Sequence, residues 1–178
     1  FGRRQVFIQD ANSLVVAPGD LMAILRHLKA RFPEVTRITS YARSSTIANL
    51  DPGALADLRA AGISRIHIGM ESGSNEVLKM VRKGATQRLH IRAGLKVKAA
   101  GMELSEYYMP GLGGRHRLEA NAVETAAALH EINPDFIRLR TLAIPTHIPL
   151  YADFAAGRFQ KATDVETVQE LLLFLESL

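Results

Sequence analysis

The sequence predicts an α/β fold in which about five parallel strands alternate with helices in a partial TIM-like (β/α) barrel. Short runs rich in β-forming residues recur along the chain, and each is followed by an amphipathic helical pattern. Successive runs begin roughly 30 residues apart, the length of one β-α unit. Right-handed crossovers between sequential parallel strands curl a sheet into a barrel, and a doubly wound sheet is the nearest alternative. The predicted strands are residues 5–9, 37–41, 65–70, 103–109 and 136–142.

Helix start and stop signals support the segments between these strands. Residues 20–32 carry apolar side chains on one helical face, and Gly19 or Asp20 can cap the start. Asp51 followed by proline is a typical helix start, and Gly62 fits the end of that helix. Further helices are predicted after Ser74, from Thr86 to Gly101, from about His116 to Ile132, and after Thr163.

The last predicted helix has the clearest local signal. Thr163 and Glu166 form a capping box, in which each side chain bonds the other residue's backbone amide. The apolar face of this helix includes Val168, Leu171, Leu172 and Leu175.

Composition indicates one compact domain over residues 1–178, because 47% of the residues are hydrophobic and Gly and Pro number only 13 and 7. No apolar stretch reaches the ~20 residues that a membrane-spanning helix needs, so no membrane association is expected. The chain opens at Phe1 with neither a start methionine nor a signal peptide, which indicates a fragment of a longer protein. Cytoplasm is the default location. The chain has no cysteine, which excludes disulfides and thiolate metal sites from these residues.

Charge gives little support for a nucleic-acid interface. The net charge is +4, and the basic residues are scattered rather than gathered into one stripe. Nucleic acid therefore remains a weakly supported partner. The six histidines show no metal-ligand spacing, so no metal site is predicted.

The strand at residues 65–71 has an unusually polar face. Alternation places Ile66, Ile68 and Met70 on one face and His67 and Glu71 on the other. A barrel whose interior holds a ligand explains this pattern, whereas a flat sheet buried on both sides favours continuous Val, Ile and Leu.

Polar or glycine-rich loops follow four of the predicted strands, and the carboxyl ends of parallel strands are where ligands gather. Together these loops predict a site for a ligand with hydroxyl, amino and carboxylate groups. The glycine-rich loop allows close backbone approach but lacks the Lys and Ser/Thr of a phosphate loop. The four loops are residues 10–13, 40–43, 71–73 and 110–114.

Arg138 and Arg140 lie two residues apart on the last strand and point to the same face. Buried arginines need carboxylate partners, for which Glu71 or Glu106 are candidates. Exposure at the strand end is the alternative.

Several segments resemble the radical S-adenosylmethionine (SAM) superfamily. Residues 68–78 with 83–86 resemble its fourth-strand region, residues 101–114 its fifth strand and glycine-rich exit, and residues 136–142 with 149–151 its sixth strand. The combination Glu71-Ser72-Gly73 with Lys83-Gly84-Ala85-Thr86 is similar to an uncharacterised branch related to coproporphyrinogen oxidases, tRNA-modifying enzymes and cobalamin-dependent members.

The resemblance implies a partial barrel of six β-α units, whose first unit carries three cysteines in a C-x3-C-x2-C loop. That segment would lie upstream of Phe1, so the 4Fe-4S cluster ligands are expected outside this chain, which should be inactive by itself. The implied chemistry is one-electron reductive cleavage of SAM to a 5′-deoxyadenosyl radical that abstracts hydrogen from an unknown substrate. A reductant such as flavodoxin or ferredoxin is the implied partner.

The same resemblance implies which residues contact SAM. Asp10 to Asn12 falls where relatives have a Gly-Gly-Glu segment near the methionine amino group. Glu71, the strongest candidate, and Ser72 match the region near the ribose. The remaining candidates are Ser40 and Tyr41 at the preceding strand end, Ser105 and Tyr107 facing the cofactor, and Arg138 and Arg140 near a carboxylate of cofactor or substrate.

Two other function classes fit the predicted fold. One is a phosphate-binding barrel lyase or isomerase that uses the loop 111–114 as an anion cradle, although catalytic lysines are missing from the polar strand faces. The other is a non-catalytic module that binds RNA or protein. The sequence identifies neither the catalytic residues nor the substrate.

Overall fold

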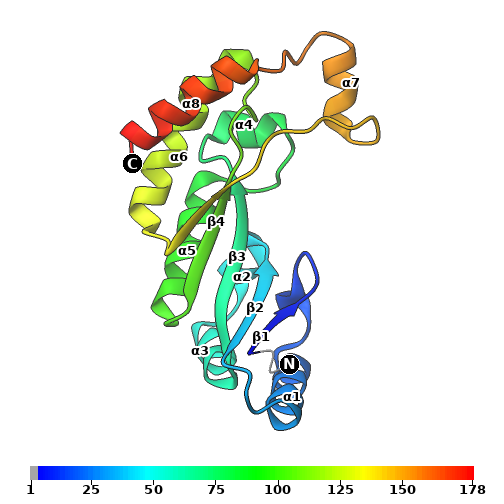
Figure 1. Ribbon diagram of the computed structural model, residues 1–178, viewed down its shortest axis with the longest axis vertical. Coiled ribbons are helices and arrows are strands. Elements are labelled where there is room, and N and C mark those ends of the chain that lie inside the picture. The colour runs from blue at the N-terminus through cyan, green and yellow to red at the C-terminus, as the bar shows by residue number, and fades with distance from the viewer. Residues whose placement is uncertain (1–3) are drawn as a thin grey trace. The chain divides into compact units, whose positions relative to one another are not determined.

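Five strands form one sheet in the computed structural model, which describes residues 4–178 (Figure 1). The order is sequential, and β1 pairs with β2 and β2 with β3 in parallel. The bonds from Asp135 N to Leu104 O and from Arg140 N to Tyr108 O advance together along β4 and β5, as parallel pairing requires. The predicted parallel α/β sheet is therefore confirmed. The strands are β1 (Gln5–Ile8), β2 (Arg37–Ala42), β3 (Ile63–Glu71), β4 (Glu103–Tyr108) and β5 (Phe136–Leu139).

The chain divides into two compact units, and β3 and β4 each run from the first into the second. The first unit comprises the described part of Phe1–Gly69 with Arg92–Glu106 and Pro134–Ile137. The second comprises Met70–Ile91, Tyr107–Asn133 and Arg138–Leu178. One domain over residues 1–178 stays a prediction.

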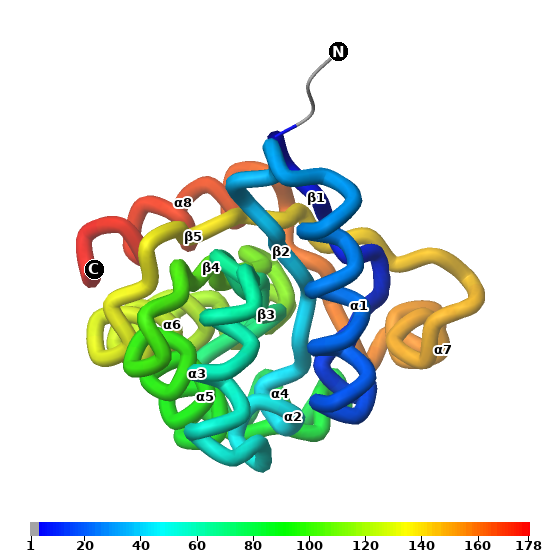
Figure 2. The backbone as a smooth tube through the Cα atoms, turned by 90° about the horizontal axis from the view of Figure 1, so that it is seen from below, coloured from blue at the N-terminus to red at the C-terminus, as the bar shows by residue number. Residues whose placement is uncertain are grey.

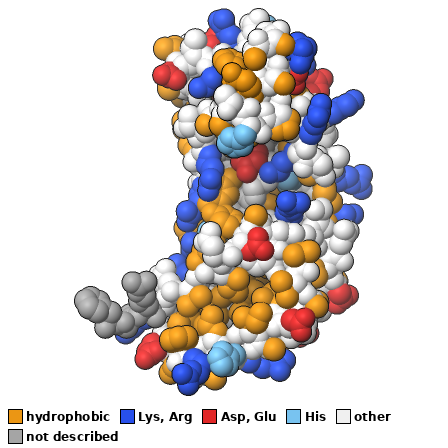
Figure 3. Space-filling model, turned by 90° about the vertical axis from the view of Figure 1, so that its right-hand side faces the viewer, with side chains coloured by type: hydrophobic (Ala, Val, Ile, Leu, Met, Phe, Trp, Pro, Cys, Tyr) orange, Lys and Arg blue, Asp and Glu red, His pale blue; other side chains and the backbone are white. Residues whose placement is uncertain are grey.

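In the first unit, the backbone runs from β1 through α1 (Pro18–Arg31) to β2, α2 (Ser44–Asn49) and α3 (Pro52–Ala61), as Figure 2 shows. α1 packs against α3, and the buried side chains of this unit include Leu25 of α1, Ile38 of β2 and Leu58 of α3. Apolar side chains also gather on the surface over α1 and the preceding turn η1 (Ser13–Val15) (Figure 3).

Local capping signals decide where these helices begin and end. Asp51 Oδ2 accepts a hydrogen bond from Gly53 N at 2.7 Å, and Gly62 ends α3 with φ of 118°, as predicted. The predicted cap of α1 at Gly19 or Asp20 is wrong, because the helix already begins at Pro18. Proline at the first helical position has its φ preset and loses no backbone bond, so the helix starts at Pro18, two residues before the acidic Asp20.

In the second unit, α6 (Leu118–Ile132) packs against α8 (Asp164–Glu176), and α4 (Asn75–Met80) and α7 (Pro149–Ala155) are short. α5 (Gln87–Ala99) begins in this unit and ends in the first. Thr86 Oγ1 accepts a bond from Leu89 N at 3.2 Å near the start of α5, as predicted.

The capping box of α8 is confirmed. Thr163 Oγ1 accepts from Glu166 N at 3.2 Å, and Glu166 Oε2 accepts from Thr163 N at 2.8 Å. The Thr163 amide bond and the bond from Arg115 lower the pKa of Glu166 to about 2.

The apolar face predicted for α8 is wrong at three of its four residues, and only Leu171 is half-buried. Val168, Leu172 and Leu175 are more than half exposed, whereas Glu170 and Phe174 are buried. Phe174 lies against Tyr108 with ring centroids 4.4 Å apart, and Glu170 bonds three donors of the unit. Contacts with partners distant in sequence therefore set the orientation of the helix.

In residues 4–178 no helix is long and apolar enough to cross a membrane.

The turn after β3 leaves no room for a side chain at Gly73. A Cβ there would lie 2.4 Å from Glu124 O and 2.5 Å from Thr125 Cα, both backbone atoms of α6. Gly73→Ala should lower the free energy of unfolding by about 1–3 kcal/mol, because α6 would have to shift. Urea denaturation measures this. Gly19→Ala, where a Cβ meets no atom within 4 Å, should not destabilise. Equal stabilities of the two variants would contradict the close approach.

Candidate functional site

Glu71 ends β3 in a conformation that few residues other than glycine adopt. Its φ is 68°, in the left-handed region. Glu71 Oε1 lies 3.6 Å from Lys83 Nζ. Glu71 Oε2 is buried and has no hydrogen-bond partner among residues 4–178. The strand end therefore presents a carboxylate oxygen with unused acceptor capacity.

Backbone bonds hold this strand end in place. The Glu71 carbonyl accepts a bond from Met109 N at 2.9 Å, and Gly73 N donates to Thr125 Oγ1 at 2.7 Å. Ser72 is fully buried, and its Oγ accepts a bond from Ser74 N at 3.0 Å. Ser72 therefore shapes the turn that carries Glu71 into α4.

Tyr107, Arg138 and Arg140 also belong to the second unit. The Arg140 guanidinium carbon lies 4.6 Å from the centroid of the Tyr107 ring, which is 8% exposed. This is a cation-π contact. Arg138 and Arg140 are both exposed, so the alternative of exposure at the strand end is the one observed, and the expected burial is wrong. β5 ends at Leu139, three residues earlier than predicted, which leaves Arg140 beyond the paired strand.

In the first unit, the end of β2 carries Ser40 and Tyr41. Ser40 is fully buried, and its Oγ donates to Tyr41 O at 3.2 Å. Tyr41 packs against both Phe7 and His67, with ring centroids 5.0 and 5.5 Å away, and these two rings also contact each other. The polar face predicted for β3 thus contributes His67 to an aromatic cluster.

Asp10 and Asn12 follow β1. Asp10 is exposed. The Asn12 side chain spans the β2-α2 connection, since Nδ2 donates to Thr46 Oγ1 at 2.9 Å and Oδ1 accepts from Arg43 N at 2.9 Å. In this structure Asn12 ties the first strand to the start of α2.

Ser105 lies in the middle of β4 and is fully buried. Within the described part of the chain, its hydroxyl has no hydrogen-bond partner. A buried hydroxyl without a partner is costly, so it is a candidate contact for a ligand.

The glycine-rich loop after β4 is held by a residue that the sequence reasoning did not single out. Glu170 of α8 is 2% exposed, and its Oε2 accepts from Gly111 N at 2.7 Å. Its Oε1 accepts from Tyr108 Oη and Asn121 Nδ2, each at 2.7 Å. Burial raises the pKa of Glu170, although the three donors oppose that shift. An acidic residue beside the apolar run 171–175 was the available signal.

Histidines give no metal centre in the described residues. No group of three His, Asp or Glu side chains in residues 4–178 could hold a metal ion. His90 is buried, and burial together with the nearby positive charge of Lys83 lowers its pKa to about 4.

The family model of the radical SAM superfamily matches residues 1–132. The chain belongs to the radical SAM superfamily. Members of this superfamily use S-adenosylmethionine, a 4Fe-4S cluster and a reductant.

Curated relatives include two tRNA uridine(34) acetyltransferases. The protein from Methanocaldococcus infernus is 23% identical over 109 residues, which are 61% of this chain and 20% of the relative. The protein from Methanocaldococcus jannaschii is 21% identical over 118 residues, or 66% of this chain and 22% of the relative. This radical SAM chain thus spans about a fifth of the length of these relatives.

Solved structures confirm the partial TIM-like barrel fold. Elp3 from Methanocaldococcus infernus superposes with a TM-score of 0.75 at 16% identity, over 96% of this chain and 44% of that chain. Coproporphyrinogen III oxidase from Escherichia coli, a radical SAM enzyme, gives a TM-score of 0.73 at 18% identity, over 97% of this chain and 40% of that chain.

The residues of this radical SAM chain can contact SAM but include no ligands for the 4Fe-4S cluster. The 178 residues include no cysteine, so no thiolate for the cluster comes from them. Glu71 Oε2 of the second unit lacks a partner within residues 4–178, and a carboxylate oxygen of this kind can accept a hydrogen bond from a hydroxyl or an amino group, both of which SAM carries.

Glu170→Gln should lower the free energy of unfolding by about 1–3 kcal/mol at pH 7, because an amide NH2 cannot accept from the donors that face it. Chemical denaturation between pH 4 and 8 tests this.

The effect should also depend on pH. The pKa of Glu170 is raised in the folded chain above its ordinary value of 4.5, so the proton adds stability that is fully present below that value. This stability is lost as the pH rises through the folded-state pKa. The difference between wild type and Glu170→Gln should therefore be largest at acid pH. Glu176→Gln, on the exposed end of α8, should keep the wild-type profile. A pH-independent difference would contradict the direction of the shift.

Proposed function

We propose that this chain is the SAM-binding core of a radical SAM enzyme and that Glu71 bonds the ribose of SAM. A 4Fe-4S cluster would have to be held by cysteines that are not among these 178 residues, and when bound it would supply the electron for reductive cleavage of SAM, the family's source of a 5′-deoxyadenosyl radical. The chain's own residues bind and orient SAM. Without the cluster ligands the chain by itself is inactive.

The observation that carries this proposal is the conformation of Glu71. A non-glycine residue at φ of 68° costs about 1–3 kcal/mol, and such strain clusters at ligand sites. A glycine would avoid the cost, so the side chain itself must be useful. Its Oε2 atom is a buried acceptor without a partner in the described residues, which suits a ribose hydroxyl.

Lys83 completes this arrangement. Its Nζ lies 3.6 Å from Glu71 Oε1, so one carboxylate oxygen faces a cation while the other stays available. The buried Ser72 fixes the turn directly after Glu71. Lys83 is thus a positioning residue for the carboxylate.

The other candidate contacts are supported to different degrees. Ser105 offers a buried hydroxyl, and Tyr107 with Arg140 offers an aromatic surface beside a cation. The proposal includes Asp10, Asn12, Ser40, Tyr41 and Arg138 as further contacts, and these stay predictions.

The phosphate-binding alternative has less support. Gly111 N, the amide that an anion cradle would use, donates to the carboxylate of Glu170 at 2.7 Å. A phosphate at this loop would have to displace that bond and lie beside a carboxyl group.

The names of the curated relatives describe enzymes acting on tRNA uridine. The match covers only about a fifth of those proteins. This short match and a net charge of only +4 give a tRNA substrate little support.

Glu71→Ala should weaken SAM binding to the 178-residue chain about tenfold or more, because a charge-assisted hydrogen bond contributes about 1.5–3 kcal/mol. Isothermal titration calorimetry with SAM measures the change. Glu76→Ala is the matched control, since Glu76 is five residues away and its side chain is 76% exposed. Equal SAM affinities for wild type and Glu71→Ala would remove Glu71 from the site.

The activity requires the chain joined to its cluster-binding segment. Such a protein, reconstituted with iron and sulfide without oxygen and reduced with dithionite, should release 5′-deoxyadenosine from SAM. Chromatography of the products detects it. Glu71→Ala should lower the yield and Glu76→Ala should not. A protein that carries the cluster and still releases no 5′-deoxyadenosine would refute the proposed function.

A further inference from the structure

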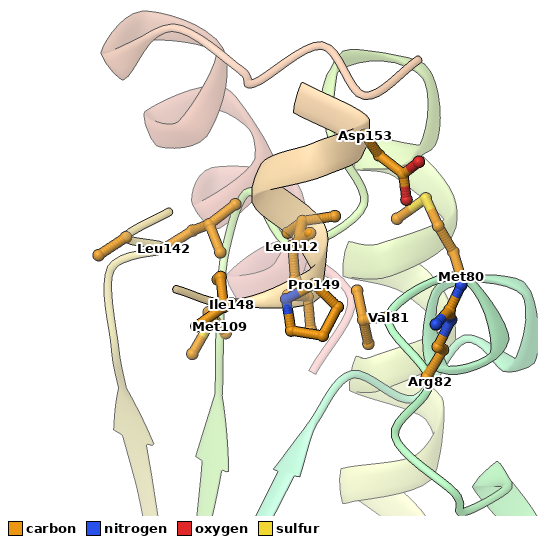
Figure 4. A pocket seen from close by; sticks show the side chains of 11 residues that line it. Met80, Val81, Arg82, Met109, Leu112, Leu142, Ile148, Pro149 and Asp153 are labelled. Carbon is orange, nitrogen blue, oxygen red and sulfur yellow. The ribbon is translucent and has the colours of Figure 1, made fainter. Parts of the chain in front are cut away.

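The second unit contains a pocket of about 340 Å³ (Figure 4). The end of α4, the segments after β4 and β5, and the start of α7 enclose it. Its volume lies at the lower end of the range for small-molecule sites, which is about 300–1,000 Å³. The lining residues are Met80, Val81, Arg82, Met109, Leu112, Leu142, Ala143, Ile148, Pro149, Leu150 and Asp153.

We propose that this pocket binds the anion of a small apolar carboxylic acid, with the hydrocarbon part against the apolar wall and the carboxylate at Arg82. The inference goes beyond the proposed radical chemistry, since it concerns binding and does not require the cluster. It rests on the wall of the pocket, the charges at its rim and the backbone of Arg82.

The wall selects for hydrocarbon. All lining residues except Arg82 and Asp153 are apolar, and Leu112 and Leu142 are each 6% exposed within a small hydrophobic cluster. Met80 and Met109 pack against the same cluster, and methionine adapts its shape to irregular ligands. A ligand with a polar body would leave its polar groups without partners here.

The charges at the rim select for an anion. Asp153 accepts a bond from Arg158 Nε at 2.8 Å, so its charge is already balanced. Lys83, beside Arg82 in sequence, faces Glu71. Arg82 has no acidic partner among residues 4–178. Figure 4 shows Arg82, Met80 and Asp153 on one side of the pocket and Leu142, Met109 and Ile148 on the other.

The backbone of Arg82 indicates that its side chain is needed there. Lys83 N donates to Leu78 O at 2.9 Å and Arg82 N to Lys79 O at 3.1 Å, which is the Schellman pattern at the end of α4. This pattern places Arg82 at φ of 53°, where glycine is favoured. Arginine at this position therefore costs stability that a glycine would not cost.

Octanoate is a suitable probe, and methionine methyl groups report on the site directly. The chain has five methionines, of which Met80 and Met109 line the pocket. In the 178-residue chain with 13C-labelled methionine methyls, octanoate should shift these two signals and leave Met22, Met70 and Met102 unchanged. 1-Octanol, which lacks the charge, should bind about three- to fivefold more weakly.

Arg82→Gly separates ligand binding from folding. This variant should weaken octanoate about three- to fivefold and bring its affinity to that of 1-octanol. It should also melt about 2–4 °C higher, because the backbone strain is relieved. Asn133→Gly is the matched control, since Asn133 ends α6 at φ of 49° and does not line the pocket. It should not change octanoate binding.

Filling the pocket gives a second pair of variants. Ala143 lines the pocket and is exposed, so Ala143→Phe should abolish octanoate binding without disturbing the core. Ala156→Phe, at the exposed end of α7 outside the lining, should bind as the wild type does.

Three results would overturn the inference. One is octanoate binding that shifts methionines outside the pocket, or shifts none. Another is an unchanged octanoate affinity in a folded Arg82→Gly. The third is displacement of octanoate by SAM, which would assign the pocket to the cofactor. If Glu71→Ala loses SAM binding and still binds octanoate, the SAM site and the pocket are separate sites, and the failure of one proposal would not remove the other.

Discussion

The buried carboxylate of Glu170 is the interaction on which the second unit depends most. An isolated carboxylate inside a protein is unfavourable by several kcal/mol, so its position is tolerated only with hydrogen-bond donors around it. Tyr108 Oη, Asn121 Nδ2 and Gly111 N supply three bonds of 2.7 Å each. These donors come from the end of β4, from α6 and from the glycine-rich loop, so one side chain of α8 fixes three segments. Met109 and Leu112 stand on the loop thus fixed, and both line the pocket.

Residues other than glycine with a left-handed backbone conformation indicate which positions of this unit are functional and which are only structural. In residues 4–178 this conformation occurs at Glu71, Arg82 and Asn133. Asn133 ends α6 and needs no further explanation, because asparagine tolerates the conformation. Glu71 and Arg82 do not share that tolerance. Glu71 has a carboxylate oxygen without a hydrogen-bond partner in residues 4–178, and Arg82 carries its charge at the edge of an apolar pocket. Strain at these two residues is therefore better explained by what their side chains bind than by the turns they occupy.

The sequence was sufficient for the features that depend on near neighbours. Strand periodicity, the Asp51 cap and the Thr163–Glu166 box act over a few residues, and the structure agrees with them. The orientation of α8 was not accessible in this way. Glu170 and Tyr108 are 62 residues apart in sequence, so no local pattern could show that Glu170 faces inward while Val168 and Leu172 face solvent. The exposure of Arg138 and Arg140 likewise depends on where β5 stops pairing.

The turn after α4 connects the two proposed sites. Arg82 and Lys83 are consecutive cations, and in an ordinary helix they would project only about 100° apart. The left-handed residue breaks that geometry, so Lys83 reaches Glu71 while Arg82 lines the pocket. A single strained residue thus distributes two positive charges between two carboxylates, one on the protein and one on the proposed ligand. Relaxing the turn with a helix-compatible backbone would bring both cations to one side and leave either Glu71 or the pocket without its counter-charge.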